Sequence, residues 1–128
     1  MGPVALVVDD EPLVLALVSA ILTARGWRVL RASDGENGLE QARGLDLDLL
    51  ITDYDLPGID GTTLARELCT SDPDLPVLVI SGHPQAVEWV EGPRHDFLAK
   101  PFGIEDLASR VEALTGFAAA RSDQATRR

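Results

Sequence analysis

The sequence predicts an α/β domain in which helices cover both faces of a parallel β-sheet. Short apolar runs rich in Val, Ile and Leu alternate with segments of helical periodicity, which is typical of repeated β-α-β units. The chain has 128 residues, 45% of them hydrophobic and 25% charged, which suits one domain with a single core. No internal repeat is visible, so we expect one domain over residues 1–116 and a flexible C-terminal tail over 117–128.

Five apolar runs are expected to form the strands. Turn-forming or charged residues bound them, as is usual for strands in α/β domains. The third run is the most continuous, which indicates a central position in the sheet. In chain order the runs are VALVVDD (4–10), WRVLRA (27–32), LDLLITD (47–53), LPVLVISG (75–82) and DFLAKP (96–101).

Five helices are expected between and after these strands. Pro12 suits the first turn of the first helix, Gly26 ends it, and Asp34 is a good N-cap for the second. The periodicity of segment 84–92 is weak and covers barely two turns, so the fourth helix should be short. The expected helices span 12–25, 34–43, 62–70, 84–92 and 104–114.

Composition excludes several classes of function. The net charge of −10 would repel a phosphate backbone, so we expect no direct nucleic-acid binding. The apolar runs are too short to cross a bilayer and the N-terminus lacks the basic region of a secretion signal, so no membrane insertion is expected. The single cysteine, Cys69, cannot form an internal disulfide and suits a cytoplasmic protein.

Polar residues end four of the five predicted strands. Asp9, Asp10 and Glu11 follow the first strand, and Asp53 ends the third. The fourth ends in Ser81-Gly82 and the fifth in Lys100-Pro101. Each residue alone could be a helix cap, a turn residue or a solvated charge. Because the carboxyl ends of parallel strands meet at one edge of the sheet, we expect all of them in one crevice.

The expected crevice favours a particular chemistry. Clustered carboxylates repel one another and raise each other's pKa values, and a divalent cation removes that repulsion. Oxygen ligands favour Mg²⁺, with Mn²⁺ as the second choice, and no Cys/His cluster with zinc spacing exists in the sequence. A carboxylate nucleophile, a divalent cation, a lysine and a hydroxyl are the parts needed to transfer a phosphoryl group onto Asp53.

The motifs VVDDEP, DYDLPGIDG, ISG and FLAKPF resemble those of the response-regulator receiver domain of two-component signalling. The resemblance covers residues 4–116 and implies a flavodoxin-like, doubly wound sheet with strand order 2-1-3-4-5. It implies a signalling module rather than an enzyme, limited to self-phosphorylation and self-dephosphorylation. A sensor histidine kinase or histidine phosphotransfer protein would load it in a phosphorelay, and a conformational switch would then control an unassigned downstream protein target.

The same resemblance implies roles for the residues of the acidic site. Asp53 is the phosphoacceptor. Asp10 ligates Mg²⁺ directly, Asp9 ligates it through water, and the backbone carbonyl of Asp55 completes the ligands from the protein. Lys100 pairs with the phosphoryl group and, before phosphorylation, with Asp53.

Further residues are implied to form the switch and to tune it. Ser81 is the switch hydroxyl, Phe97 is the switch aromatic, and Pro101 follows a cis peptide bond that shapes the Lys100 loop. His83, two residues after Ser81, and Asp55, two after Asp53, flank the path of a hydrolytic water. We hypothesise that His83 slows or gates loss of the phosphoryl group; an exposed loop histidine with no such role is the alternative.

The sequence departs from the family pattern between Ser81 and Lys100. This interval of 19 residues is short, so the fourth helix should be short or irregular. That helix normally belongs to the output face, so the choice of partner and the dimerisation mode are open; a homodimer is compatible with the sequence.

Other functions compete with this interpretation. Asp53-Tyr54-Asp55 also matches the Asp-x-Asp of haloacid-dehalogenase-like aspartyl phosphatases, although that motif ends a first strand and the chain leaves no room for a cap domain. A pseudo-receiver that binds partners without phosphorylation is disfavoured because every position that the chemistry needs is filled. A flavodoxin-like FMN binder is disfavoured because Asp9-Asp10-Glu11 would repel a phosphate.

Overall fold

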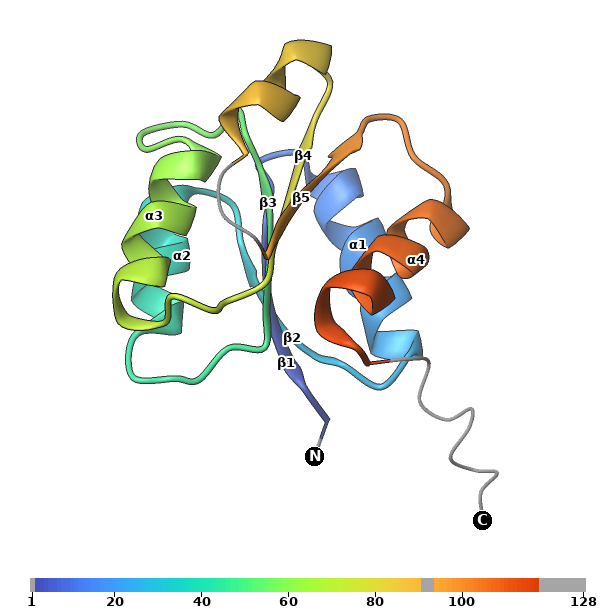
Figure 1. The fold of residues 1–128 in the computed structure, drawn as a ribbon, viewed down its shortest axis with the longest axis horizontal. Helices are drawn as coiled ribbons and strands as arrows, with labels where there is room; N and C mark the ends of the chain where they lie inside the picture. The colour runs from blue at the N-terminus through green and yellow to red at the C-terminus, as the bar shows by residue number, and fades with distance from the viewer. Residues whose placement is uncertain (1, 91–93, 118–128) are drawn as a thin grey trace.

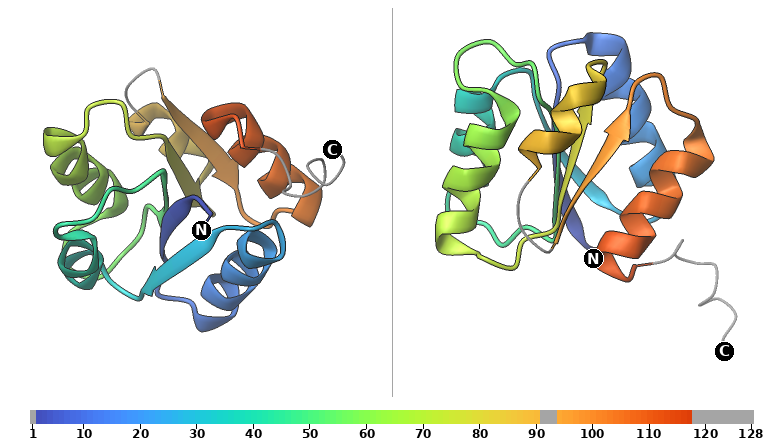
Figure 2. Two further views of the ribbon diagram at one scale, coloured as in Figure 1. Left: turned by 90° about the horizontal axis from the view of Figure 1, so that it is seen from below. Right: turned by 45° about the horizontal axis from the view of Figure 1, so that its top comes forward.

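The computed structural model describes residues 2–90 and 94–117, which form a three-layer α/β sandwich (Figure 1). A five-stranded sheet lies between two pairs of helices: α2 and α3 cover one face, and α1 and α4 cover the other (Figures 1 and 2). The strands are β1 (Val4–Val8), β2 (Arg28–Ala32), β3 (Leu49–Asp53), β4 (Val77–Ser81) and β5 (His95–Ala99). The helices are α1 (Pro12–Ala24), α2 (Gly35–Ala42), α3 (Gly61–Ser71) and α4 (Ile104–Thr115), with a 3₁₀ helix, η1 (Pro84–Trp89), after β4.

All five strands run parallel in the order β2-β1-β3-β4-β5, which confirms the predicted fold. The direction of strand addition reverses between β1 and β3, and ligands of doubly wound sheets bind beside that point. Register brings the ends of the inner strands level, since Val8 pairs with Thr52, Asp53 with Ile80 and Ser81 with Ala99. The polar residues after these strands therefore reach the same edge of the sheet.

The inner strands are buried on both faces, which explains their unbroken apolar sequences. Successive side chains of a strand point to opposite faces. In β3, Leu49 and Ile51 pack in the core under α1 and α4, whereas Leu50 packs in the core under α2 and α3. β1 and β4 divide their side chains in the same way between the two cores. Asp53 and Thr52 are the polar residues of β3, and both are buried.

Aspartate caps are present at the starts of α2 and α3, the first of them predicted from the sequence. Asp34 accepts a hydrogen bond from the backbone N–H of Asn37 at 2.7 Å and starts α2. Asp60 accepts one from the N–H of Thr63 at 2.8 Å and starts α3. These caps satisfy N–H groups that have no partner within the helix. The Asp60 cap also fixes the start of α3 after the loop that follows β3.

The fourth predicted helix is shorter and tighter than expected. The sequence predicted five helices, but the described residues contain four α-helices, and segment 84–89 forms the 3₁₀ helix η1. The prediction of a short or irregular fourth helix is confirmed, and the segment is a 3₁₀ helix where the count of five helices had expected another helix of the same kind. A segment with Pro84 in its first turn and an extended residue at Val90 completes about two tight turns, and 3₁₀ geometry is common in such short pieces.

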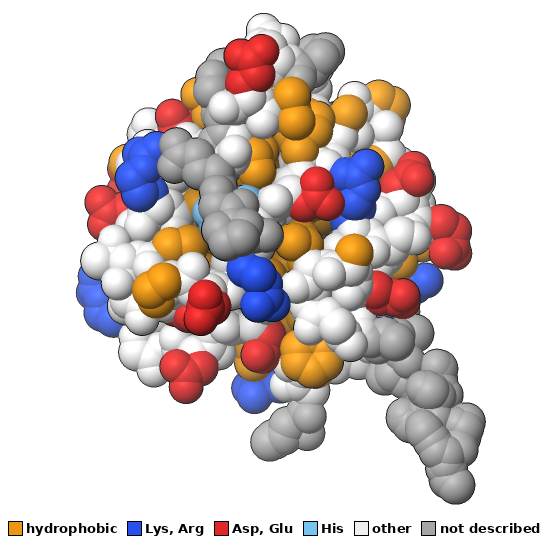
Figure 3. All heavy atoms as spheres, in the orientation of Figure 1, with side chains coloured by type: hydrophobic (Ala, Val, Ile, Leu, Met, Phe, Trp, Pro, Cys, Tyr) orange, Lys and Arg blue, Asp and Glu red, His pale blue; other side chains and the backbone are white. Residues whose placement is uncertain are grey.

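The C-terminal boundary is only partly described. The predicted tail, 117–128, lies outside the described residues except for Phe117, whose ring meets Trp27 edge-to-face with centroids 5.5 Å apart. Across the described parts of the chain, no helix is both long and apolar enough to cross a membrane. On the face seen in Figure 3, acidic and basic side chains are interspersed with apolar ones.

Candidate functional site

An acidic cluster lies at the carboxyl edge of the sheet. Asp9 and Asp10 follow β1 and Asp53 ends β3, and one carboxylate oxygen from each lies within 4.8 Å of the others. Asp9 is fully buried and Asp53 is 4% exposed, whereas Asp10 is exposed. The sequence predicted that these three carboxylates would converge, and the structure brings them together.

Backbone contacts hold the two buried acids in place. The N–H of Glu11 donates to Asp9 Oδ1 at 2.9 Å, and the N–H of Asp55 donates to Asp53 Oδ1 at 3.3 Å. Gly61 allows the loop after β3 to fold back, because a Cβ at this position would lie 2.2 Å from the carbonyl oxygen of Asp53. The loop therefore presents the Asp53 carboxylate to the cluster with one oxygen already bonded.

Lys100, in the loop after β5, provides the positive charge of the cluster. Its Nζ lies 2.7 Å from Glu11 Oε1, 3.1 Å from Asp9 Oδ2 and 3.3 Å from Asp53 Oδ2. Its side chain is 16% exposed, so water screens these ion pairs less than it screens surface pairs. The predicted pairing of Lys100 with Asp53 is present. Sequence reasoning assigned no role to Glu11, although its place directly after the two aspartates is a signal that could have led to one.

Burial and mutual repulsion shift the titration of these groups. Burial, and after it the charge of Asp9, raise the pKa of Asp53 against the opposing charge of Lys100, and the result is a pKa of about 6. Burial also raises the pKa of Asp9 above its ordinary value. Burial lowers the pKa of Lys100, but the carboxylates of Glu11, Asp53 and Asp9 outweigh it and raise that pKa above its ordinary value. At pH 7, Asp53 is therefore mostly ionised and less stabilised than a solvated aspartate.

The predicted switch residues lie on β4, the strand next to β3, and on β5, which pairs with β4. Ser81 ends β4, is fully buried, and its Oγ accepts a hydrogen bond from the N–H of His83 at 3.0 Å. Its carbonyl accepts from the N–H of Lys100 at 2.9 Å, which ties the β4 and β5 ends together. Phe97 is half-buried on β5. The Lys100–Pro101 peptide bond is cis, as the resemblance implies.

The two predicted tuning residues contact each other. His83 Nε2 lies 3.2 Å from Asp55 Oδ2, and the two side chains are 59% and 51% exposed. Asp55 follows β3 and His83 follows β4, so the contact joins the loops after two neighbouring strands. The sequence predicted that both residues would flank the site but did not predict that they would touch.

The donor set fits a hard divalent cation. It consists of carboxylate oxygens, the ligands that Mg²⁺ and Mn²⁺ prefer. Asp9 Oδ2 is buried without a hydrogen-bond partner, since its 3.1 Å contact with Lys100 lacks the alignment of a hydrogen bond. A bound cation would stabilise a buried carboxylate oxygen that has no hydrogen-bond partner. Loss of water on burial is also the main reason why the pKa values of Asp9 and Asp53 are raised.

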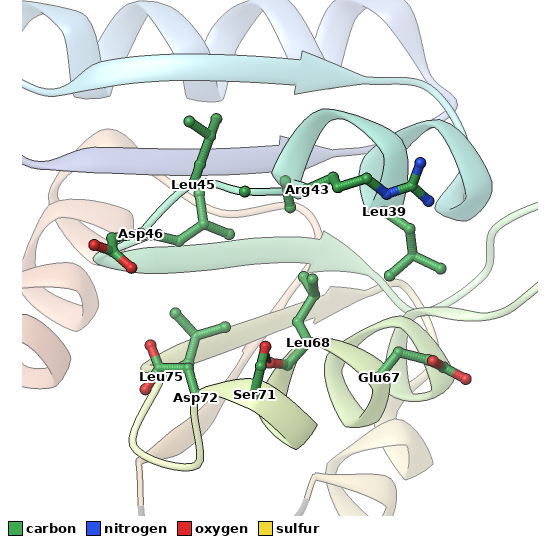
Figure 4. Close-up of a pocket in the computed structure, with 12 residues that line it drawn as sticks. Leu39, Arg43, Leu45, Asp46, Glu67, Leu68, Ser71, Asp72 and Leu75 are labelled. Atoms are coloured by element: carbon green, nitrogen blue, oxygen red, sulfur yellow. Dashed lines mark hydrogen bonds between the residues drawn. The ribbon is translucent and has the colours of Figure 1, made fainter.

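A separate hollow lies at the opposite edge of the sheet, between the C-terminal ends of α2 and α3 (Figure 4). It has a volume of about 920 Å³. Leucines line it, including Leu39, Leu45 and Leu68, and Asp46, Glu67 and Asp72 are among its charged residues. It contains none of the acidic-cluster residues, so we place the chemistry at the carboxyl edge.

Fold and site together define a class of protein: a doubly wound α/β domain with three converging aspartates and one lysine at its carboxyl edge. The family model of the response regulator receiver domain matches residues 5–112. The chain belongs to this family, the receiver domains of two-component response regulators, which are signalling modules.

Known proteins agree with this assignment. The chain is 36% identical over 117 residues to the DNA-binding dual master transcriptional regulator RpaA of Synechocystis sp., covering 88% of this chain and 48% of that protein. The receiver domain of the hybrid histidine kinase CckA matches with 38% identity and a TM-score of 0.74, covering 88% of this chain and 98% of that one. A response regulator receiver protein from Sinorhizobium medicae matches with 32% identity and a TM-score of 0.83, covering 90% and 95%.

The chain spans about half the length of the curated relatives it matches. The solved receiver domains, in contrast, are covered almost completely. The comparison therefore assigns the receiver domain and leaves the activity of a whole regulator to be proposed.

Proposed function

We propose that this domain accepts a phosphoryl group on Asp53 from a sensor histidine kinase or a histidine phosphotransfer protein. One observation carries the proposal: a 4% exposed aspartate ends a central strand with a lysine ammonium 3.3 Å from its carboxylate. Asp9 and Asp10 supply carboxylates within 4.8 Å. This arrangement provides a nucleophile, a countercharge in Lys100 and carboxylates for a cation.

The transfer forms one bond and breaks one. A carboxylate oxygen of Asp53 attacks the phosphorus, the bond from phosphorus to the donor nitrogen breaks, and its electron pair stays on the imidazole. Lys100 is placed to pair with a phosphoryl oxygen, and burial makes its charge more effective there. The pKa of about 6 leaves Asp53 mostly ionised at neutral pH, as a nucleophile must be.

Asp9, Asp10, Asp53 and the backbone carbonyl of Asp55 would hold Mg²⁺, or Mn²⁺ in its place. When bound, the cation supplies positive charge that offsets the cluster and the phosphoryl oxygens. The unpartnered Asp9 Oδ2 and the convergence of the three carboxylates support this ligand set. The chemistry of the chain is limited to its own phosphorylation and dephosphorylation.

Ser81 and Phe97 are proposed to carry the switch. Ser81 Oγ is held by the N–H of His83 in this structure, and it would turn to a phosphoryl oxygen once one is present. Phe97 lies on β5, the strand beside β4, and is half-buried, so its exposed part could become buried in the switched state. A downstream protein, or a second copy of the chain, would then recognise the surface around β4 and β5 in its changed conformation.

The contact between His83 and Asp55 is proposed to slow loss of the phosphoryl group. The pair joins the loops that directly follow Asp53 and Ser81, so it narrows the approach of a hydrolytic water. His83→Ala opens that approach.

The output of a whole regulator is also a proposal. RpaA is by its name a DNA-binding transcriptional regulator, and this chain covers about half of it. We propose that any contact with DNA belongs to other parts of such a regulator, because the net charge of −10 disfavours DNA binding by this domain. We also propose a cytoplasmic location, because the proposed histidine kinase partner would phosphorylate the domain there.

The proposed function is tested with a small phosphoryl donor. The chain is incubated with acetyl phosphate and Mg²⁺, and the added phosphoryl group is measured by intact-protein mass spectrometry. Labelling should be lost in Asp53→Asn and when EDTA removes the cation. A chain that never labels would be a pseudo-receiver, and one that turns over many small phosphomonoesters would be a phosphatase; either result contradicts the proposal.

A further inference from the structure

Lys100 contacts an acid at the solvent-exposed entrance of the acidic site as well as the buried acids inside it. The shortest contact of its Nζ is with Glu11 Oε1, at 2.7 Å, compared with 3.3 Å to Asp53 Oδ2. Asp9 and Asp53 are buried, whereas the Glu11 side chain is 59% exposed. The ammonium therefore lies between two buried acids and one at the solvent boundary, and it lies closest to the outer one.

Glu11 is placed by the backbone to make this contact. It occupies the N-cap position of α1 but makes no side-chain capping hydrogen bond, so its carboxylate is available. Its N–H donates to Asp9 Oδ1 at 2.9 Å, and its carbonyl accepts from the N–H of Leu15 at 3.0 Å. The main chain of Glu11 is thus anchored on both sides, and only the side chain spans to the Lys100 loop.

We propose that Glu11 is a positioning residue that holds Lys100 at the mouth of the site until a phosphoryl group on Asp53 draws the ammonium away. The inference rests on the proposed phosphorylation of Asp53. It adds that Glu11 competes with the incoming phosphoryl group for the ammonium of Lys100. An ammonium has three hydrogens, and Asp9, Asp53 and Glu11 surround it. A phosphoryl group brings three acceptor oxygens and additional negative charge. Of the two carboxylates that accept a hydrogen bond from Lys100, Asp53 is buried and would carry the phosphoryl group, so we expect Lys100 to release Glu11, which lies at the solvent boundary.

Shortening or neutralising Glu11 should speed labelling. Without the outer carboxylate, Lys100 is free to bind the incoming phosphoryl group. Exposed ion pairs contribute little, so we expect labelling by acetyl phosphate to rise roughly two- to fivefold. Glu11→Gln removes one negative charge near the site and leaves at most a weaker, neutral hydrogen bond to Lys100. Glu11→Asp keeps the charge but is one methylene too short to reach Lys100, so it separates the contact from the field of the charge.

The position of Lys100 can be measured directly because it is the only lysine in the sequence. Protein made with ¹³C,¹⁵N-lysine gives one side-chain Cε–Nζ signal, which needs no assignment. We expect Glu11→Asp and Glu11→Gln to move this signal in the same direction in the unphosphorylated chain. Glu105→Gln is the matched control, since it removes an equal charge from a side chain that is 88% exposed and pairs with Arg25.

Signal and rate together decide the inference. It is supported if both Glu11 variants move the lysine signal and label faster while Glu105→Gln does neither. It is overturned if wild type labels but Glu11→Asp matches it in signal and rate, because only the field of the charge would then matter. A wild-type chain that takes no phosphoryl group would instead overturn the proposed function.

Discussion

The two edges of the sheet are built from the same kinds of residue and do different things. At the carboxyl edge, Asp9 and Asp53 are buried in a tight group around Lys100, and burial raises the pKa values of both acids. At the opposite edge, a hollow of about 920 Å³ has acids among leucines, and Glu67 and Asp72 remain exposed there (Figure 4). Burial destabilises the charged forms of Asp9 and Asp53 at the carboxyl edge, whereas water solvates Glu67 and Asp72 at the opposite edge.

This comparison shows that the size of a hollow does not locate chemistry. A reactive site needs charges that water cannot satisfy, and parallel strands deliver them to the edge where their carboxyl ends meet. The leucine-lined hollow has space and apolar surface but no buried charge. Substitutions at the two edges should therefore differ in kind as well as in size.

The largest effect is expected from Lys100→Ala. It removes the positive charge within 3.3 Å of Asp53, so labelling by acetyl phosphate should fall about 100-fold, as for the loss of one donor at other charge-stabilising sites. Initial labelling rates at saturating Mg²⁺ measure this, with circular dichroism to confirm folding. A rate within about tenfold of wild type would show that the buried charge is not needed.

Asp53→Asn should stabilise the fold at neutral pH. The pKa of Asp53 is about 6 in the folded chain and near the ordinary 3.8 when unfolded. The folded chain therefore binds more protons between these values, and ionised Asp53 lowers the unfolding free energy as pH rises from about 4 to about 6. We expect Asp53→Asn to be more stable by about 3 kcal/mol at pH 7 and by little at pH 4.

Urea unfolding without Mg²⁺, at both pH values, measures this difference between wild type and Asp53→Asn. Asp72→Asn is the control from the opposite edge, where the carboxylate is exposed, and it should show no such dependence. Equal stability of wild type and Asp53→Asn at pH 7 would mean that Asp53 is not strained by burial.

A smaller effect is expected from His83→Ala. Loss of the 3.2 Å contact with Asp55 opens the approach to Asp53, and the phosphoryl group should be lost roughly threefold faster, in keeping with a half-exposed polar contact. The decay of phosphorylated chain after removal of the donor measures this. Equal decay in wild type and variant would leave His83 as an ordinary loop residue.

The smallest effect is expected from Leu45→Ser in the hollow. Leu45 is 51% exposed, so the unfolding free energy should change by less than about 1 kcal/mol. Labelling should remain within about twofold of wild type, since the hollow lies at the far edge of the sheet. A strong loss of labelling would break the comparison by coupling the two edges.

Much of the fold could be predicted from the sequence because apolar burial decides it. The inner strands β1, β3 and β4 are buried on both faces, so each appears as an unbroken apolar run. The convergence of Asp9, Asp10 and Asp53 could also be predicted, since strand ends share an edge of the sheet. Segment 84–89 could not, because weak periodicity over two turns does not distinguish an α-helix from a 3₁₀ helix.

The sequence by itself determined which residues reach the acidic edge, and only the tertiary structure decided which of them touch. Strand register is set by burial of apolar side chains along the whole strand, and the pattern of apolar residues can be seen in the sequence. The contacts of Lys100 with Glu11 and of His83 with Asp55 depend on loop paths and on side-chain reach. These contacts join residues that are far apart in the chain, and no periodicity specifies them.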